Sequence, residues 1–184
     1  MTKGVDLFLQ IAQLVEERRP NQFQFIWVGS KSELEEKNYG VFIKEFIEKS
    51  KSLNNFIFLE QTSELPKLMK EIDAYALTSR LDTFPNVAIE ALCLGKPVIC
   101  FEKTGGIPNY LESLELEELC IANYLDVSDF ATKLIKLVND QNSLDRFSKE
   151  IKVTAESDFD MDLYVKKLLE FGSEAKKLVS LKNG

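Results

Sequence analysis

Residues 78–108 read TSRLDTFPNVAIEALCLGKPVICFEKTGGIP, and this stretch decides the fold. Its polar start leads to Pro85, which suits the first turn of a helix because its missing N–H would have no partner there. The residues that follow are almost all apolar and predict a largely covered helix over 85–94. A second apolar run predicts a buried strand over 97–101, and Gly105-Gly106 predicts a turn. A helix that leads directly into a buried strand is typical of α/β proteins.

The same alternation continues on both sides of this stretch. Further helices are predicted over 5–18, 39–50, 65–70 and 108–113, and further strands over 23–28, 56–59, 73–77 and 119–122. From 126 onward only helices are predicted, over 126–139, 144–156 and 162–178. The expected fold class is therefore α/β, a Rossmann-like doubly wound parallel sheet followed by an all-helical C-terminal segment. Ligands bind such sheets at the carboxyl ends of the strands, so the loops after Val28, Leu59, Leu77 and Phe101 are where we expect a site.

Composition narrows the possible functions. A chain of 184 residues suits one compact domain, and its net charge of −7 argues against nucleic acid as a partner. The chain has no histidine and no paired cysteine spacing, so we expect neither a zinc site nor histidine-based acid–base chemistry. No apolar run is long enough to span a bilayer, and residues 1–10 do not resemble a signal peptide. We therefore expect a cytoplasmic protein, in which Cys93, Cys100 and Cys120 are reduced.

Two acidic residues stand out in the deciding stretch. The N-terminus of the predicted helix follows a strand, and its free N–H groups would suit a phosphate. Glu90 is the only charged residue in the run 87–94, so we expect a buried carboxylate that needs a partner. That partner could be a structural base or a ligand hydroxyl, or the side chain could simply reach the surface. Asp82 or Thr83 could cap the helix.

Several motifs in order resemble the signature of glycosyltransferase family 4. The motifs are Lys3-Gly4, Trp27-Val28-Gly29, Asp82 to Ala91, Gly95 to Val98, Gly105 to Pro108 and Phe159-Asp160-Met161. That family consists of retaining enzymes of the GT-B type, in which two Rossmann-like domains face a cleft. The resemblance runs almost from end to end, whereas no G-x-G-x-x-G or P-loop of other nucleotide-binding folds is present.

The resemblance implies roles for individual residues. Asp82, Glu90 and Lys3 would form the catalytic set: Asp82 would contact hydroxyls of the donor sugar, Glu90 would hold the ribose and Lys3 would neutralise the departing phosphate. The remaining donor-binding positions would be the backbone N–H groups of Thr83, Phe84, Asn86 and Val87 around the diphosphate, Gly29 at a close backbone approach, and Gln61 and Thr62 beside the base. The helix end and Lys3 would supply the positive charge, so no cofactor and no divalent metal are expected.

Some positions depart from the family pattern. Asp82 stands where the family has Glu, Thr83 and Glu60 stand where Gly is frequent, and Asn109 replaces an acidic residue. Because Asp82 is one methylene shorter than Glu, its reach to the sugar would differ. An alternative to an enzyme is therefore a non-catalytic nucleotide-sugar-binding or interaction domain. A glycoside hydrolase with Asp82 and Glu90 as its acid pair fits less well, because such pairs flank a single bond.

The resemblance also sets an expected domain organisation. In the family, a strand ending in Arg comes before Lys3-Gly4, and a separate N-terminal domain carries the acceptor site. We therefore expect residues 1–184 to form a single nucleotide-sugar-binding domain without that strand and that domain. Such a fragment would be inactive by itself and would self-associate through the exposed strand edges. The acceptor, a glycan, polysaccharide or lipid, and any peripheral membrane contact would belong to the missing domain.

Overall fold

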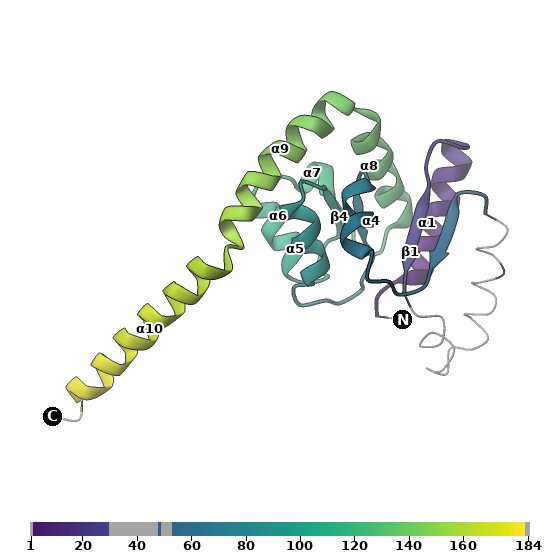
Figure 1. The fold of residues 1–184 in the computed structure, drawn as a ribbon. Coiled ribbons are helices and arrows are strands. Elements are labelled where there is room, and N and C mark those ends of the chain that lie inside the picture. Colours follow the sequence, from purple (N-terminus) through teal and green to yellow (C-terminus); the bar gives the residue numbers. More distant parts are fainter. Residues whose placement is uncertain (1, 30–47, 49–52, 183–184) are drawn as a thin grey trace.

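The computed structural model describes residues 2–29, 48 and 53–182 of the chain. Its elements are α1 (Val5–Arg18), β1 (Phe25–Val28), β2 (Phe56–Leu59), α4 (Leu65–Glu71), β3 (Tyr75–Leu77), α5 (Asn86–Cys93), β4 (Val98–Phe101), α6 (Gly106–Ser113), α7 (Glu117–Cys120), β5 (Ile121–Ala122), α8 (Val127–Asn139), α9 (Gln141–Asp158) and α10 (Met161–Lys182) (Figure 1). The helix predicted over 39–50 lies outside the described residues, apart from Glu48.

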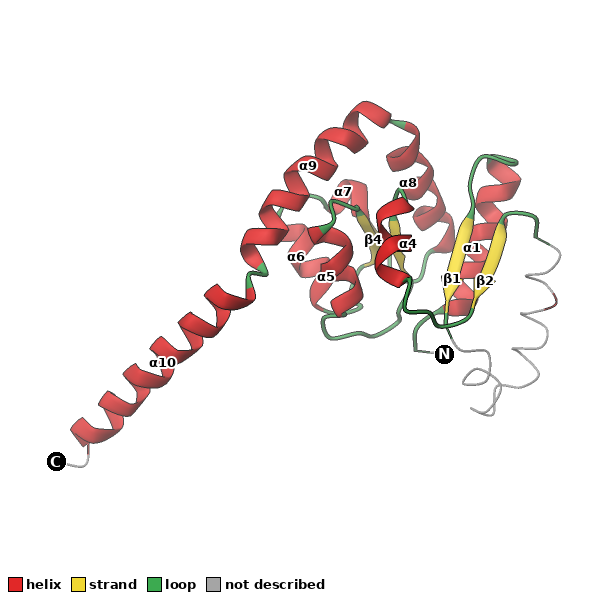
Figure 2. Ribbon diagram, in the orientation of Figure 1, coloured by secondary structure: helices red, strands yellow, loops and turns green. Residues whose placement is uncertain are grey.

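All described strands are parallel, as predicted, but they form two separate ladders. β1 pairs with β2 (Figure 2). In the second ladder β4 lies between β3 and β5. Within the described residues, no strand pairing joins β1 to β3. The predicted α/β class and the helical C-terminal segment are confirmed.

Alternating side chains of β4 reach two different hydrophobic cores. Ile99 and Phe101 belong to one core with α1, β1, β2 and α8, and Phe101 packs on Phe130 of α8 with ring centroids 4.9 Å apart. Val98 and Cys100 belong to the other core, with α5, α6 and α9. Because successive residues of a strand point to opposite faces, β4 is buried on both sides between two layers of helices. The carboxyl end of β4 is thus held between two hydrophobic cores.

The predicted element boundaries were wrong at one strand. Residues 119–122 were expected to form a strand, but α7 takes up Glu117–Cys120 and only Ile121–Ala122 is extended. Smaller shifts occur at β1, which begins at Phe25, and at α6, which begins at Gly106. A short apolar run fits a buried strand and a buried helical turn equally well.

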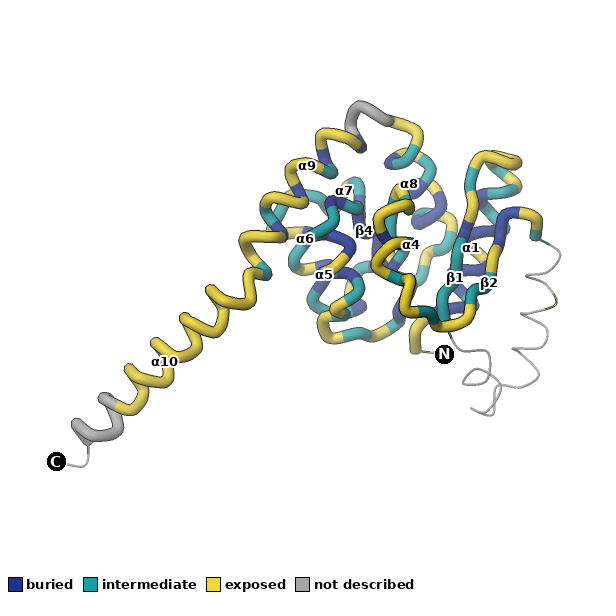
Figure 3. Tube along the Cα trace, viewed as in Figure 1, coloured by how far each residue is buried: buried dark blue, intermediate teal, exposed yellow. Residues whose placement is uncertain are grey.

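The last helix leaves the body of the protein. α10 projects away from the end of α9 (Figure 1), and its described side chains are exposed along its length (Figure 3). Nevertheless, no helix in the described part of the chain has the length and apolar character needed to cross a membrane.

Candidate functional site

The backbone around Lys3 is fastened to the end of β3. The N–H of Arg80 donates to the carbonyl of Thr2 at 2.8 Å, and the Thr78 hydroxyl donates to the carbonyl of Lys3 at 3.2 Å. Gly4 has a φ of 72°, and a Cβ there would lie 1.9 Å from the Thr78 carbonyl oxygen. The tight turn at Gly4 therefore requires glycine, and it places the Lys3 side chain beyond the carboxyl end of β3.

Lys3 and Asp82 form a direct ion pair. Lys3 Nζ lies 2.5 Å from Asp82 Oδ2, and the Ser79 hydroxyl lies 3.5 Å from the same oxygen. The Lys3 side chain is 68% exposed, whereas that of Asp82 is only 16% exposed. The structure thus brings together two residues that lie 79 positions apart in sequence.

The prediction that Asp82 or Thr83 caps the following helix was wrong. α5 begins at Asn86, Pro85 occupies the N-cap position, and no side chain of the described residues caps it. The Asp82 carboxylate is turned instead toward Lys3 and Ser79.

The loop that carries Asp82 is held by the loop after β4. The N–H of Asp82 donates to the Thr104 carbonyl at 2.8 Å, and the N–H of Gly106 donates to the Thr83 carbonyl at 2.7 Å. Gly105 has a φ of 149°, and a Cβ there would lie 1.7 Å from the Asp82 carbonyl oxygen. A side chain at Gly105 would therefore clash with the Asp82 loop, so the close contact between the two loops requires glycine.

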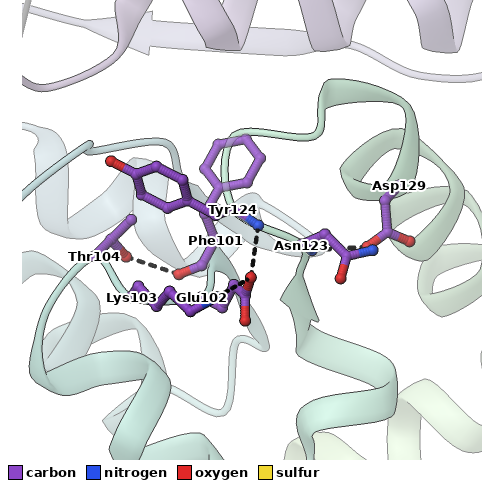
Figure 4. A network of polar contacts seen from close by, with 7 residues as sticks. All are labelled: Phe101, Glu102, Lys103, Thr104, Asn123, Tyr124 and Asp129. Atoms are coloured by element: carbon purple, nitrogen blue, oxygen red, sulfur yellow. Dashed lines mark hydrogen bonds and ion pairs between the residues drawn. The ribbon is translucent and has the colours of Figure 1, made fainter.

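The loop after β4 is held by internal bonds and by a bond to the segment after β5, shown in Figure 4. The Thr104 hydroxyl donates to the Phe101 carbonyl at 2.8 Å, and the N–H of Tyr124 donates to Glu102 Oε1 at 3.2 Å. Lys103 pairs with Glu102 at 2.8 Å. Of these contacts, only the bond to the Phe101 carbonyl involves Thr104, whose own carbonyl accepts from the N–H of Asp82.

The start of α5 presents backbone donors next to this ion pair. The Pro85 carbonyl accepts from the N–H of Ala88 at 3.0 Å, which closes the first turn. The N–H groups of Thr83, Phe84, Asn86 and Val87 donate to no other group in the described part of the chain. Unpaired N–H groups at a helix start carry partial positive charge and suit an anion.

Glu90 lies one turn further along α5 and is exposed, so the expectation of a buried carboxylate was wrong. Ala88, Ala91 and Leu92 carry the buried side of the helix, and Glu90 lies outside that side. Among the residues whose side chains are described, no cation forms an ion pair with Glu90. Its carboxylate is therefore accessible to a ligand.

A half-buried tyrosine, Tyr75, lies near both carboxylates. Burial, together with the negative charges of Asp82 and Glu90, raises the pKa of Tyr75 to about 12. Both carboxylates thus lie within electrostatic reach of one phenol at the start of β3. Lys3, Asp82, Glu90 and the start of α5 form one group of polar features.

The remaining predicted positions belong to the neighbouring ladder. The N–H of Gly29 donates to the Leu59 carbonyl at 3.0 Å and so extends the β1–β2 pairing. Thr62 Oγ1 accepts from the N–H of Glu64 at 3.1 Å, and Gln61 is exposed beside it. Thr62 also lines an open hollow of about 390 Å³ between the end of β2 and α4. In the described residues, no hydrogen bond or ion pair joins these positions to the Lys3–Asp82 group.

Sequence reasoning did not single out several supporting residues. Ser79 contacts the Asp82 carboxylate, Thr104 holds its backbone, and Arg80 binds both carboxylate oxygens of Asp6, at 2.8 and 2.5 Å. The Arg80–Asp6 pair ties the first turn of α1 to the end of β3 and lowers the pKa of Asp6 against the opposing effect of burial. The available signal was position, since Ser79, Arg80 and Thr104 each lie within three residues of the end of β3 or β4.

The chain is similar in sequence to known glycosyltransferases. The family described as "Glycosyl transferases group 1" matches residues 1–154. The chain belongs to this glycosyltransferase family. A relative named "Uncharacterized glycosyltransferase" from Haemophilus influenzae is 25% identical over 169 residues, which cover 91% of this chain and 44% of the relative.

Solved structures of glycosyltransferases share the fold. Anabaena HepE in complex with UDP and glucose superposes with a TM-score of 0.74 at 24% identity, over 94% of this chain and 45% of HepE. The trehalose 6-phosphate synthase of Burkholderia multivorans superposes with a TM-score of 0.78 at 14% identity, over 100% of this chain and 42% of the synthase. This glycosyltransferase chain therefore spans less than half the length of each of these proteins.

Proposed function

We propose that this chain is the donor-binding domain of a retaining glycosyltransferase that takes a sugar from a nucleotide-sugar. The observation that carries the proposal is the group at the carboxyl end of β3. Lys3 and the unpaired N–H groups at the start of α5 lie there beside the two carboxylates, Asp82 and Glu90. Positive groups suited to a diphosphate thus adjoin acceptors suited to sugar and ribose hydroxyls.

The proposed mechanism relies on positioning and charge. The N–H groups of Thr83, Phe84, Asn86 and Val87 would bind the diphosphate, and Lys3 would stabilise the negative charge that grows on it as the sugar leaves. Glu90 would accept hydrogen bonds from the ribose, and Asp82 from the sugar. Because these groups supply the positive charge, we propose a site that requires no divalent metal. HepE, which shares the fold, has been solved with UDP and with UDP-glucose, and this supports a nucleotide-sugar as the ligand class.

We propose that the base lies over the loop after β2. Gln61 and Thr62 would border it, next to the hollow at α4. Gly29 would let the backbone come close to the ligand from the end of β1. These positions belong to the β1–β2 ladder, so a bound nucleotide would connect the two ladders.

The acceptor is proposed to bind elsewhere in a longer protein. Relatives with this fold are more than twice as long as the matched region. A second domain would hold a glycan, polysaccharide or lipid acceptor against the donor, and residues 1–184 alone would bind the donor without transferring it.

The test is nucleotide-sugar binding by the 184-residue chain and by a Glu90→Gln variant. Titration calorimetry with UDP-, GDP- and ADP-glucose should detect binding of at least one of them to the wild type. Loss of the charged acceptor should weaken that binding about tenfold, the equivalent of about 1.4 kcal/mol. Glu112→Gln provides the control, because Glu112 is an exposed acid on α6 and lies outside the site. A wild type that binds none of the three ligands, or equal binding by Glu90→Gln and wild type, would contradict the proposal.

A further inference from the structure

The structure pairs two side chains that the proposed function assigns to different parts of the donor. Lys3 would bind the phosphate and Asp82 would bind the sugar, yet Lys3 Nζ and Asp82 Oδ2 lie 2.5 Å apart. We propose, on the basis of that function, that this ion pair makes the site favour an intact nucleotide-sugar over the nucleoside diphosphate left after transfer.

The two partners differ in their freedom to leave the pair. Lys3 is 68% exposed and carries its charge on a flexible four-carbon stem, so it can turn toward a phosphate at little cost. Asp82 is 16% exposed, and its backbone is held by Thr104 and by the contact with Gly105. Its carboxylate therefore stays in place when Lys3 moves.

A nucleoside diphosphate alone offers nothing to the carboxylate that remains. When Lys3 turns to the phosphate, the Asp82 carboxylate keeps, among the described residues, only the Ser79 hydroxyl, at 3.5 Å. A largely covered carboxylate that loses its charged donor is destabilised, and it also repels the nearby diphosphate. Binding of the product thus carries a cost that comes from the protein itself.

A nucleotide-sugar can supply new hydrogen-bond donors to Asp82 in place of Lys3. Its sugar hydroxyls can donate hydrogen bonds to the carboxylate at the moment when Lys3 moves to the diphosphate. The exchange keeps both charged groups paired, so the donor avoids the cost that the product bears. After transfer the sugar is gone, and the return of Lys3 to Asp82 favours release of the diphosphate.

The experiment compares the dissociation constants of UDP and UDP-glucose for the wild type and for Asp82→Asn, with the GDP and ADP pairs used in parallel. Asparagine keeps the shape but removes the charge that holds Lys3. We expect Asp82→Asn to bind the nucleoside diphosphate about three- to fivefold more tightly, since it no longer has to break the ion pair. It should bind the nucleotide-sugar less tightly than the wild type, so that the preference for the donor falls at least tenfold. Asp82→Ala should shift the preference in the same direction, which guards against an effect peculiar to asparagine.

Controls separate this inference from the proposed function. Glu102→Gln removes an ion pair with Lys103 in the adjacent loop and should leave the preference unchanged. A wild type that binds neither diphosphate nor nucleotide-sugar overturns both the function and the inference. A wild type that binds both ligands, with a preference that changes less than twofold in both Asp82 variants, overturns the inference alone.

Discussion

The two carboxylates of the proposed site differ in their surroundings, and we propose different roles for them on that basis. Asp82 is largely covered and directly paired with Lys3, whereas Glu90 is exposed on α5 and accessible. A covered, paired carboxylate changes partner only in exchange for another donor. An exposed one can accept a hydrogen bond from a ligand with little rearrangement. We therefore assign the selective step to Asp82 and plain ligand binding to Glu90.

The ionisation of Tyr75 should make the stability of the protein depend on pH. Its pKa is raised to about 12, first by burial and then by Asp82 and Glu90. Between about pH 10 and pH 12 the unfolded chain has lost this phenolic proton while the folded chain retains it. Stability should therefore fall as pH rises through this range, by about 2–3 kcal/mol at most from this residue.

The measurement is urea unfolding at intervals from pH 9 to pH 12, for wild type and Tyr75→Phe. Phenylalanine keeps the ring but cannot ionise, so its stability should fall less steeply above pH 10. Parallel curves for the two proteins would show that Tyr75 titrates normally.

Contacts distant in sequence explain where residue-level prediction failed. Motif order was enough to propose Lys3, Asp82 and Glu90 together, and the structure places them in one region. The expected cap at Asp82 was wrong because Lys3, which is far away in sequence, takes the carboxylate. The expected burial of Glu90 was wrong because an apolar run shows what a helix can bury and not how much of it the neighbours cover.

Among the helices and strands, the sequence predicted best a helix with a long run of regularly spaced apolar residues and a strand made only of apolar residues. α1 was predicted at its observed bounds, since its apolar residues recur at helical spacing and Pro20 follows it. β4 was predicted because a short apolar run between turn residues fits a strand buried on both faces. The two-ladder arrangement could not be read from any single strand, because pairing depends on which neighbours are present.

Asp126 is expected to stabilise α8, the helix that packs against α1. Its carboxylate accepts from the N–H groups of Ser128 and Asp129, both at 2.9 Å. Removing this N-cap with Asp126→Ala should cost about 0.5–2 kcal/mol of unfolding free energy. Urea unfolding at pH 7 checks this, with Asp126→Asn as the variant that keeps the cap. If Asp126→Ala and Asp126→Asn destabilise the protein equally, the loss of stability does not come from the loss of the N-cap.

At the scale of the whole molecule, β1 and β3 are covered less completely than β4. Ile26, Trp27 and Val28 are only half-buried, whereas every residue of β4 is buried. In the described part of the chain, β1 and β3 each have one edge without a strand partner. Such edges favour association with another chain, and the exposed helix α10 offers a second surface for it.

α10 carries an apolar stripe formed by Met161, Tyr164, Leu168 and Phe171. These side chains are 69, 59, 55 and 68% exposed, respectively. Spacings of three and four residues place them on one face of the helix, the pattern of helices that pack against another helix. Exposed apolar surface of this kind marks an interaction site.

We predict that the 184-residue chain self-associates through this stripe. Full burial of one such side chain is worth about 1.5–3 kcal/mol, so several from each copy can offset an association cost of about 4–15 kcal/mol. Light scattering coupled to gel filtration should show a mass that rises with concentration for the wild type and stays monomeric for Leu168→Lys/Phe171→Lys. Glu170→Gln/Glu174→Gln changes the net charge by the same amount outside the stripe, so it should behave like the wild type. A wild type that stays monomeric at all concentrations would contradict the prediction. Association that persists in the lysine variant would also contradict it and would point to the strand edges, because the stripe of α10 is disrupted in that variant.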